Sequence, residues 1–423
     1  MTEALKSVRN IWKIPDLRKK VIYTLLMLFV IRIGAHVPVP FVNAAAVREV
    51  LEMQGTGPLK LINMISGGAF EDMTIFALGI VPYINASIIF QLLQIAIPKL
   101  EEIAKEGEEG RKRIAKYTRY LTIALAALQA WGTTFALRNQ NILIYSNLWT
   151  WIVVIVTFVA GTTFLVWVGE QITEKGVGNG ISLIIFINIV SRLPLAITTL
   201  FSYKDKYISI ILLIVIFVLM IAFVVLVQDG ERRISVQYAK RVAGRRIYGG
   251  QSTHIPLKAN LGGVMPIIFA MSILQFPIMM TNFFTSNPTG LWGKIITYIN
   301  WTHPVGAILY AVLIFGFSFF YSTVAFNPVD VADNMKKNGG FIPGIRPGNP
   351  TAEYLRKTLN NITVVGALFL TIIALLPIVL QWIFKMSIGF GGTSIIIVVG
   401  VALETVQQIE AQMLMRHYKG FLS

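Results

Sequence analysis

The chain has 423 residues, of which 55% are hydrophobic and only 14% are charged, and it contains no cysteine. Soluble domains carry about 25% charged residues, so this composition excludes a string of soluble domains and indicates a polytopic membrane protein. The absence of cysteine excludes disulfides, a thiolate nucleophile and Cys-based metal sites. The net charge of +16 has to lie outside the bilayer, where it can meet anionic lipid, acidic protein or nucleic acid.

Ten windows are long and apolar enough to cross a bilayer, which takes about 20 residues. They lie near 21–37, 74–97, 117–137, 149–168, 181–201, 207–228, 261–285, 304–326, 358–383 and 388–404. The first is the weakest, because it holds Arg32 and ends at Pro38; its basic leader and the small residues after it also fit a cleaved signal peptide. Arg192 and Pro194 interrupt the fifth, so its outer end is expected in the interface.

The positive charges of the loops orient these spans. One side holds 28 of the 37 Lys and Arg and the other side holds eight, while Arg32 lies within a span. Because cytoplasmic loops are enriched in Lys and Arg, both termini are expected in the cytoplasm, which requires an even number of spans. The expected fold class is therefore an all-α membrane protein with ten transmembrane helices.

Ten spans divide into two five-helix halves, 1–202 and 203–423, which would have opposite orientations in the membrane. Gly79-Ile80-Val81-Pro82-Tyr83-Ile84-Asn85-Ala86 in span two and Gly263-Val264-Met265-Pro266-Ile267-Ile268-Phe269-Ala270 in span seven share Gly, Pro, Ile and Ala at the same offsets. The match between the two segments could also arise by chance, since these residues are common in membrane helices. Inverted repeats of this kind place the functional pathway between the halves.

The outer loop 38–73 is unusually long. Its second half, from Leu59 to Met73, is semi-apolar and helix-like, and it contains Ser66-Gly67-Gly68. An interfacial helix and a re-entrant segment surrounded by protein both fit this pattern.

Residues that could carry catalysis are missing. The four histidines lie in loops, at span ends or in the tail, without zinc-ligand spacing, and there is no phosphate loop. Arg32 and Glu404 are the candidate charges inside spans and both lie near span ends, which argues against a proton relay. We therefore expect no enzyme and no cofactor or metal. Whatever crosses this protein is therefore expected to be driven from outside it, by a partner or by the membrane potential, as in a passive channel. An ion-coupled carrier and an intramembrane enzyme are the alternative functions.

Two basic cytoplasmic loops are long and patterned. In 228–260, apolar and polar residues alternate from Arg232 to Tyr238, and Gly244 followed by a second run around Ile247 predicts a hairpin. In 326–357, Pro-fixed turns hold Arg346 forward. Simple retention of the loops in the cytoplasm explains the charges but not the patterning, so we expect docking of RNA phosphates or acidic protein. The basic residues concerned are Lys240, Arg241, Arg245, Arg246 and Arg346.

Several motifs then occur in the order of one known family. They are Gly79 to Ile88, Gly178-Asn179-Gly180-Ile181-Ser182, Gly230-Glu231-Arg232-Arg233-Ile234, Gln251 to Lys258, Pro343-Gly344-Ile345-Arg346-Pro347-Gly348 and Gly391-Gly392-Thr393-Ser394. On these motifs the chain resembles the SecY/Sec61-alpha family of protein-conducting channels along essentially its whole length.

The resemblance implies an hourglass pore between two inverted five-helix halves, closed at its waist by a ring of aliphatic side chains. By motif position the ring would comprise Ile80, Ile84, Ile88, Ile181, Ile185, Ile268 and Ile397. The spacing of four in the first three suits one helix face. A narrow apolar collar disfavours continuous water, so ions would have no hydrated path.

The resemblance also implies a plug helix and a lateral gate. The plug maps to about 61–72 and includes Leu61, Ile65, Gly67, Gly68, Phe70 and Asp72. The gate lies between spans two–three and seven–eight, with Ser87, Gln91, Thr281 and Asn282 as candidate lining residues.

The family's partners follow from the same resemblance. They are the small membrane subunits SecE and SecG, the ATPase motor SecA, the translating ribosome, signal sequences and unfolded polypeptides, and anionic lipids. The expected location is the bacterial plasma membrane. Asp229 and Glu231 depart from expectation, because they make the base of the first docking loop less basic.

Overall fold

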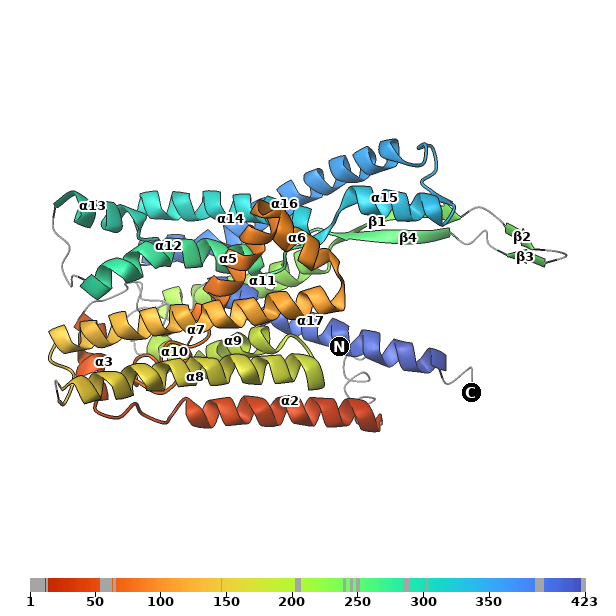
Figure 1. Cartoon of the computed structure of the whole chain (residues 1–423). Coiled ribbons are helices and arrows are strands. Elements are labelled where there is room, and N and C mark those ends of the chain that lie inside the picture. The colour runs from red at the N-terminus through yellow and green to blue at the C-terminus, as the bar shows by residue number, and fades with distance from the viewer. Residues whose placement is uncertain are drawn as a thin grey trace.

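The computed structural model is an elongated helical bundle with a small sheet projecting from one end (Figure 1). It describes residues 14–53, 66–145, 147–201, 207–238, 241–243, 246–248, 252–284, 290–301, 303–384 and 392–419, together with Trp12 and Asn63. The first half contains α2 (Pro15–Gly34), α3 (Ala44–Met53), α5 (Val81–Ala96), α6 (Pro98–Lys105), α7 (Glu108–Asn139), α8 (Leu148–Lys175), α9 (Gly180–Ser191) and α10 (Leu193–Phe201).

The second half contains α11 (Tyr207–Gln228), α12 (Met265–Phe284), α13 (Gly290–Ile299), α14 (Pro304–Ala325), α15 (Pro328–Lys337), α16 (Asn349–Phe384) and α17 (Gly392–Lys419). Its strands are β1 (Glu231–Tyr238), β2 (Arg241–Ala243), β3 (Arg246–Tyr248), β4 (Ser252–Lys258) and β5 (Gly340–Phe341). The sheet and α15 lie at one end of the bundle, whereas α3 and α13 lie at the other (Figure 1).

Each of the ten predicted windows contains a helix. Among the described residues, six helices are individually long and apolar enough to cross a membrane, and α5 with α6 passes only as a pair bent by 103°. The apolar parts of α9 and α12 are shorter than a full span. The chain is therefore an all-α, multi-pass membrane protein.

The prediction that span two runs as a helix from residue 74 was wrong. Thr74 forms an isolated antiparallel bridge with Pro38, residues 75–80 form turns, and α5 begins only at Val81. Gly79 has a φ of +58°, which is outside the right-handed helical region, and the ring of Pro82 is tolerated only in the first helical turn. The helix therefore starts inside the bundle instead of at its outer surface.

The two segments proposed as repeats have matching backbones. Gly79 and Gly263 have φ values of +58° and +57°, and a helix begins two residues after each. The N–H groups of Ile84 and Ile268 then donate to carbonyls four residues earlier, at N···O distances of 3.0 and 3.2 Å. This likeness favours a shared structural role over chance matching.

The halves contact each other on two sides. The helices α5 and α7 pack against α12, and α9 packs against α17. The largest buried apolar cluster draws residues from all of these helices except α7. The interior of the bundle is thus built at the junction of the two halves, although the division at residue 202 stays a prediction.

The loop 228–260 forms a hairpin, but its pairing differs from the predicted one. β1 pairs antiparallel with β4, so that Glu231 faces Lys258, while Ile247 pairs with Val242 in the separate β2–β3 hairpin. β5 of the second loop pairs with the end of β1. A Cβ atom on Gly340 would lie 2.9 Å from the Tyr238 ring, so glycine allows this pairing, and the two loops form one unit.

Candidate functional site

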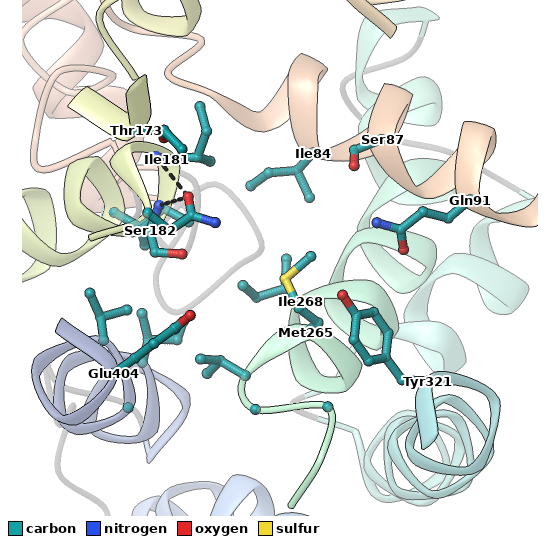
Figure 2. Close-up of a pocket in the computed structure, with 18 of the residues that line it drawn as sticks. Ile84, Ser87, Gln91, Thr173, Ile181, Ser182, Met265, Ile268, Tyr321 and Glu404 are labelled. Carbon is teal, nitrogen blue, oxygen red and sulfur yellow. Dashed lines mark hydrogen bonds between the residues drawn. The ribbon is translucent and has the colours of Figure 1, made fainter. Parts of the chain in front are cut away.

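A cavity of about 1060 Å³ lies between the helices, and Lys258 at the end of β4 is among the residues that line it. Its inner part is apolar, and five of the seven predicted ring residues line it: Ile84, Ile181, Ile185, Ile268 and Ile397. They come from α5, α9, α12 and α17, two helices from each half. In Figure 2 the side chains of Ile84 and Ile268 point into the cavity, with Ile181 on its opposite side.

These isoleucines lie within the first two turns of their helices. The start of α9 is fixed by Asn179, whose Oδ1 accepts hydrogen bonds from the N–H groups of Ile181 and Ser182 at 3.1 and 3.3 Å. An N-cap of this kind satisfies backbone donors that the helix leaves unpaired. It thereby orients Ile181 at the cavity surface.

Ile80 and Ile88 occupy different positions from the other five. Both belong to the same buried cluster, but neither is among the residues that line the cavity. The sequence predicted that Ile80, Ile84 and Ile88 share one face of a helix. Ile80 precedes α5, so only Ile84 and Ile88 lie on that helix.

The wall of the cavity nearer to the sheet is polar. Its charged residues are Lys112, Arg119, Lys258, Glu170, Glu174 and Glu404. The Nε atom of Arg119 lies 3.1 Å from Oε1 of Glu170, which joins α7 to α8. The sequence analysis missed Arg119 and Glu170 because their apposition depends on how two helices pack, which spacing along the chain does not reveal.

The predicted plug helix does not extend over residues 66–72, although Asn63 is helical. Leu61 and Ile65 lie outside the described residues, whereas residues 66–73 form consecutive turns. Gly67 and Gly68 have φ values of +69° and +91°, which a right-handed helix excludes. Phe70 is buried and packs in a second apolar cluster.

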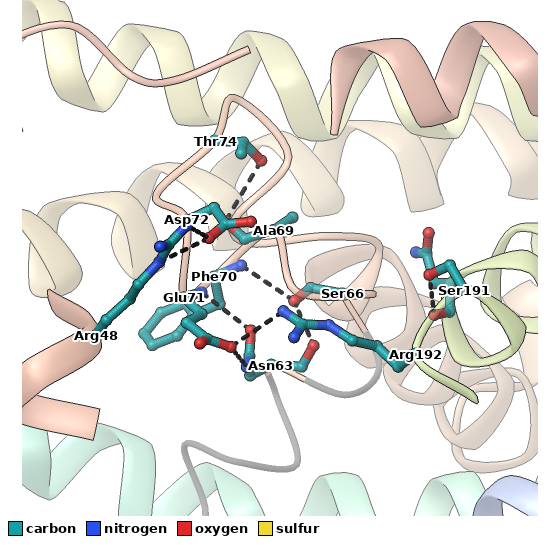
Figure 3. Close-up of polar contacts among 11 residues, drawn as sticks. Arg48, Asn63, Ser66, Ala69, Phe70, Glu71, Asp72, Thr74, Ser191 and Arg192 are labelled. Atoms are coloured by element: carbon teal, nitrogen blue, oxygen red, sulfur yellow. Dashed lines mark hydrogen bonds and ion pairs between the residues drawn. The ribbon is translucent and has the colours of Figure 1, made fainter. Parts of the chain in front are cut away.

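Polar contacts fasten this segment at two points (Figure 3). Nη2 of Arg192, directly after α9, lies 3.1 Å from Oε2 of Glu71, which also accepts a hydrogen bond from Asn63 at 2.7 Å. Nε and Nη2 of Arg48 donate to Oδ1 of Asp72 at 3.1 and 2.6 Å, and this contact raises the pKa of Arg48. We call these two ion pairs the plug clamp.

The plug glycines lie directly against the bundle. A Cβ atom on Gly68 would lie 1.7 Å from Nη2 of Arg192, and one on Gly67 would lie 3.0 Å from Cα of Asn188. Asn188 lies in the last turn of α9 and Arg192 is the residue that caps it, whereas Ile181 and Ile185 lie in the first two turns of the same helix. One short helix therefore connects the plug segment to the cavity.

Of the four candidate gate residues, Ser87 and Gln91 line the cavity (Figure 2). Oε1 of Gln91 is buried and has no hydrogen-bond partner among the described residues. Thr281 is buried away from the cavity, where it donates to the Pro277 carbonyl at 2.8 Å and accepts from Nε1 of Trp292 at 3.0 Å. For Asn282 the structure describes the backbone only, within α12.

The docking residues are described in part. Arg346 is exposed, and the Thr351 hydroxyl donates to its carbonyl at 2.8 Å, which fixes the turn. Arg241 and Arg246 pair with other residues of β2 and β3 through the backbone; Lys240 and Arg245 lie outside the described residues. Within the part of the chain that the structure describes, no group of three His, Asp or Glu could hold a metal ion.

Apolar side chains from both halves that converge at the inner end of an open cavity define the chain as a membrane channel. The family model of SecY matches residues 74–406. The protein translocase subunit SecY of Streptomyces scabiei is 46% identical over 437 residues, covering 99% of this chain and 100% of that protein. The chain belongs to the SecY family; it is the pore-forming subunit of a protein-conducting channel and not an enzyme.

Two solved structures show the same fold. One is a SecY structure whose plug domain is described as stabilising the closed state of the translocation channel and maintaining a membrane seal; it matches with TM-score 0.66 and 18% identity, covering 94% of this chain and 92% of that chain. The other is Sec61 in the canine ribosome–channel complex from the endoplasmic reticulum, with TM-score 0.62, 18% identity and the same coverage of 94% and 92%.

Proposed function

We propose that unfolded secretory polypeptides cross the membrane between the two halves, through a collar formed by Ile84, Ile181, Ile185, Ile268 and Ile397, with Ile80 and Ile88 adjoining it. The observation that carries the proposal is the convergence of the first five on one cavity from four helices of both halves. Most isoleucines of a membrane protein face lipid. Five isoleucines that face one internal cavity instead are therefore better explained by a role in the pore than by burial alone.

The collar closes the pore to ions by its chemistry. Branched apolar side chains offer water no hydrogen-bond partners, so a narrow ring of them disfavours a continuous water column. An extended polypeptide can push such side chains apart without specific contacts. The same ring therefore accommodates many sequences and still resists small ions.

The segment 61–72 is proposed to act as the plug that supports this closure at rest. Partly exposed ion pairs typically contribute about 0–1 kcal/mol each, and the plug clamp contains two. The two pairs together thus contribute about 0–2 kcal/mol, which is weak enough for an arriving polypeptide to overcome.

The seam between α5 with α7 and α12 with α14 is proposed as the lateral gate for signal sequences and membrane segments. Ser87 and Gln91 would line it on the cavity side, and Thr281 and Asn282 on α12. The contact of α5 and α7 with α12 corresponds to a closed gate, which has to separate before an apolar segment can reach the lipid.

Partners are proposed from charge and from the family. The joined sheet and Arg346 would dock the translating ribosome or SecA, and the basic ends of the helices would contact anionic lipid. SecE and SecG would be the membrane subunits. The proposed location is a bacterial plasma membrane with both termini in the cytoplasm, as the distribution of Lys and Arg favours.

Ion conductance of the purified channel in planar bilayers tests the collar. We expect the Ile84→Ser/Ile268→Ser double variant to conduct ions at rest, because hydroxyls allow water to fill the waist. The matched control is Ile89→Ser/Ile273→Ser, on the same two helices at exposed positions outside the cavity lining. Equal conductance of the two double variants would contradict the collar assignment.

A further inference from the structure

The base of the docking sheet is tied to a pore helix by one side chain, that of Gln407. Its Oε1 accepts a hydrogen bond from Nζ of Lys258 at 2.8 Å, and its Nε2 donates to Oδ1 of Asp229 at 3.3 Å. Lys258 ends β4, and Asp229 follows α11 just before β1. Gln407 therefore contacts the β1–β4 hairpin at both ends of its base: at the last residue of β4 and just before β1.

The hairpin base is itself closed, so the two contacts act on one rigid unit. Glu231 faces Lys258 across the ladder, and the Ala259 N–H donates to the Gly230 carbonyl at 2.8 Å. A displacement of the sheet therefore moves Asp229 and Lys258 together. An amide suits this position because it can accept from an ammonium and donate to a carboxylate at the same time.

Gln407 lies on α17, ten residues beyond Ile397 of the collar. At 1.5 Å per residue this corresponds to about 15 Å along the helix axis. Between them, α17 lies against the turn that begins α9: a Cβ atom on Gly178 would lie 3.3 Å from Oγ1 of Thr405. Movement of α17 would thus reach collar residues in both halves, namely Ile397 directly and Ile181 through α9.

We propose that Gln407 is a positioning residue that couples docking on the cytoplasmic sheet to the collar. The inference rests on the proposed docking function and deepens it by naming the connection to the pore. It also gives Asp229 a role, since its carboxylate accepts from the amide that holds the hairpin base. A docked partner that tilts the sheet would pull on α17 through Lys258 and Asp229.

The experiment measures two quantities on the full channel in bilayers: the affinity for ribosomes carrying a nascent chain, and the conductance that they induce. We expect Gln407→Ala to leave the affinity within about twofold and to reduce the induced conductance about five- to tenfold. This corresponds to about 1–1.4 kcal/mol, within the range of a typical net hydrogen-bond contribution, because both bonds are exposed to solvent. Gln408→Ala is the control, one residue further along α17.

A rescue variant separates coupling from simple loss of packing. Lys258→Gln/Gln407→Lys exchanges the two ends of one hydrogen bond and keeps a cation near Asp229. We expect it to recover induced conductance that the single Gln407→Lys variant loses, because that variant places two ammonium groups together.

Each outcome bears on one claim. Induced conductance in Gln407→Ala equal to that of Gln408→Ala would overturn the coupling and leave the docking function intact. Loss of ribosome affinity in Gln407→Ala would also overturn it, because Gln407 would then maintain the docking surface itself. Absence of measurable ribosome affinity in the unmodified channel would refute the docking function, whereas affinity without any induced conductance would overturn the coupling alone.

Discussion

Gly68 shows at the scale of one residue why the plug segment fits the bundle closely. Its φ of +91° is unfavourable for any residue with a Cβ atom, and that atom would collide with the Arg192 guanidinium. The left-handed backbone costs roughly 1–2 kcal/mol for such a residue. The collision adds to this cost and acts directly on the plug clamp.

We therefore expect Gly68→Ala to raise resting ion conductance, because the plug can no longer lie against α9. Gly344→Ala is a matched control: Gly344 has a φ of +84°, but nothing lies within 4 Å of the added methyl group. Planar-bilayer recordings measure the resting conductance of both variants. Gly344→Ala carries only the backbone penalty, whereas Gly68→Ala carries the backbone penalty and the collision with Arg192. A resting conductance in Gly68→Ala as low as that of Gly344→Ala would show that the plug does not depend on this contact.

Single residues differed in how far the sequence could reveal their roles. Ile84, Ile181, Ile185, Ile268 and Ile397 were predicted from motif positions, and the structure brings them to one cavity. The pairing of Arg192 with Glu71 was not predicted, because 121 residues separate the partners and Arg192 suggested only an interrupted span. Long-range ion pairs leave no periodic signal in a sequence.

At the scale of elements, the outer end of α12 depends on a contact with α13. The Thr281 hydroxyl accepts from Nε1 of Trp292, so Thr281→Val would remove this hydrogen bond between the two helices, which contributes about 0.5–1.5 kcal/mol. We expect this change to loosen α12 and to shift the gate toward separation of α5 and α12.

Spin labels at Ile89 and Ile273 can report that separation, since both positions are exposed and the chain contains no cysteine to remove. We expect Thr281→Val to lengthen the distance between the labels. Thr297→Val serves as control, because Thr297 bonds only to the carbonyl of Gly293 within its own helix, at 2.9 Å, as far as the described contacts go. Identical distance distributions in both variants would argue against a gate restrained by Thr281.

Helices and strands were predictable where their pattern was regular. Long apolar helices such as α8 and α11 follow from hydropathy alone. The late start of α5 and the turns at residues 66–73 did not follow, because glycines with positive φ override the helical pattern there. The hairpin was predicted correctly as an element, but its strand pairing was not. Pairing depends on which strands meet in space, and β5, which pairs with β1, comes from a loop about 80 residues after β4.

At the scale of the whole molecule, the sheet and α15 project from one end (Figure 1), and the loops 228–260 and 326–357 that contribute them contain 12 Lys and Arg. Arg346 is exposed in a turn fixed by Thr351. We expect Arg346→Gln to weaken ribosome binding about three- to tenfold and to reduce the slope of log affinity against log salt by about one, as loss of one phosphate contact implies.

Binding titrations at several salt concentrations measure this effect. Lys294→Gln removes the same charge from α13, an exposed position at the opposite end of the bundle, and should leave both affinity and slope unchanged. Equal losses in the two variants would mean that net charge, and not a docking surface, governs binding.

The most direct test of the central claim is site-specific crosslinking of a stalled secretory chain in the assembled channel. Photoreactive probes would replace Ile84, Ile185, Ile268 and Ile397 one at a time, with Ile89 as the exposed control on α5. The account predicts crosslinks to the stalled chain from all four collar positions and none from position 89. Crosslinks from none of the four would contradict a path through the collar.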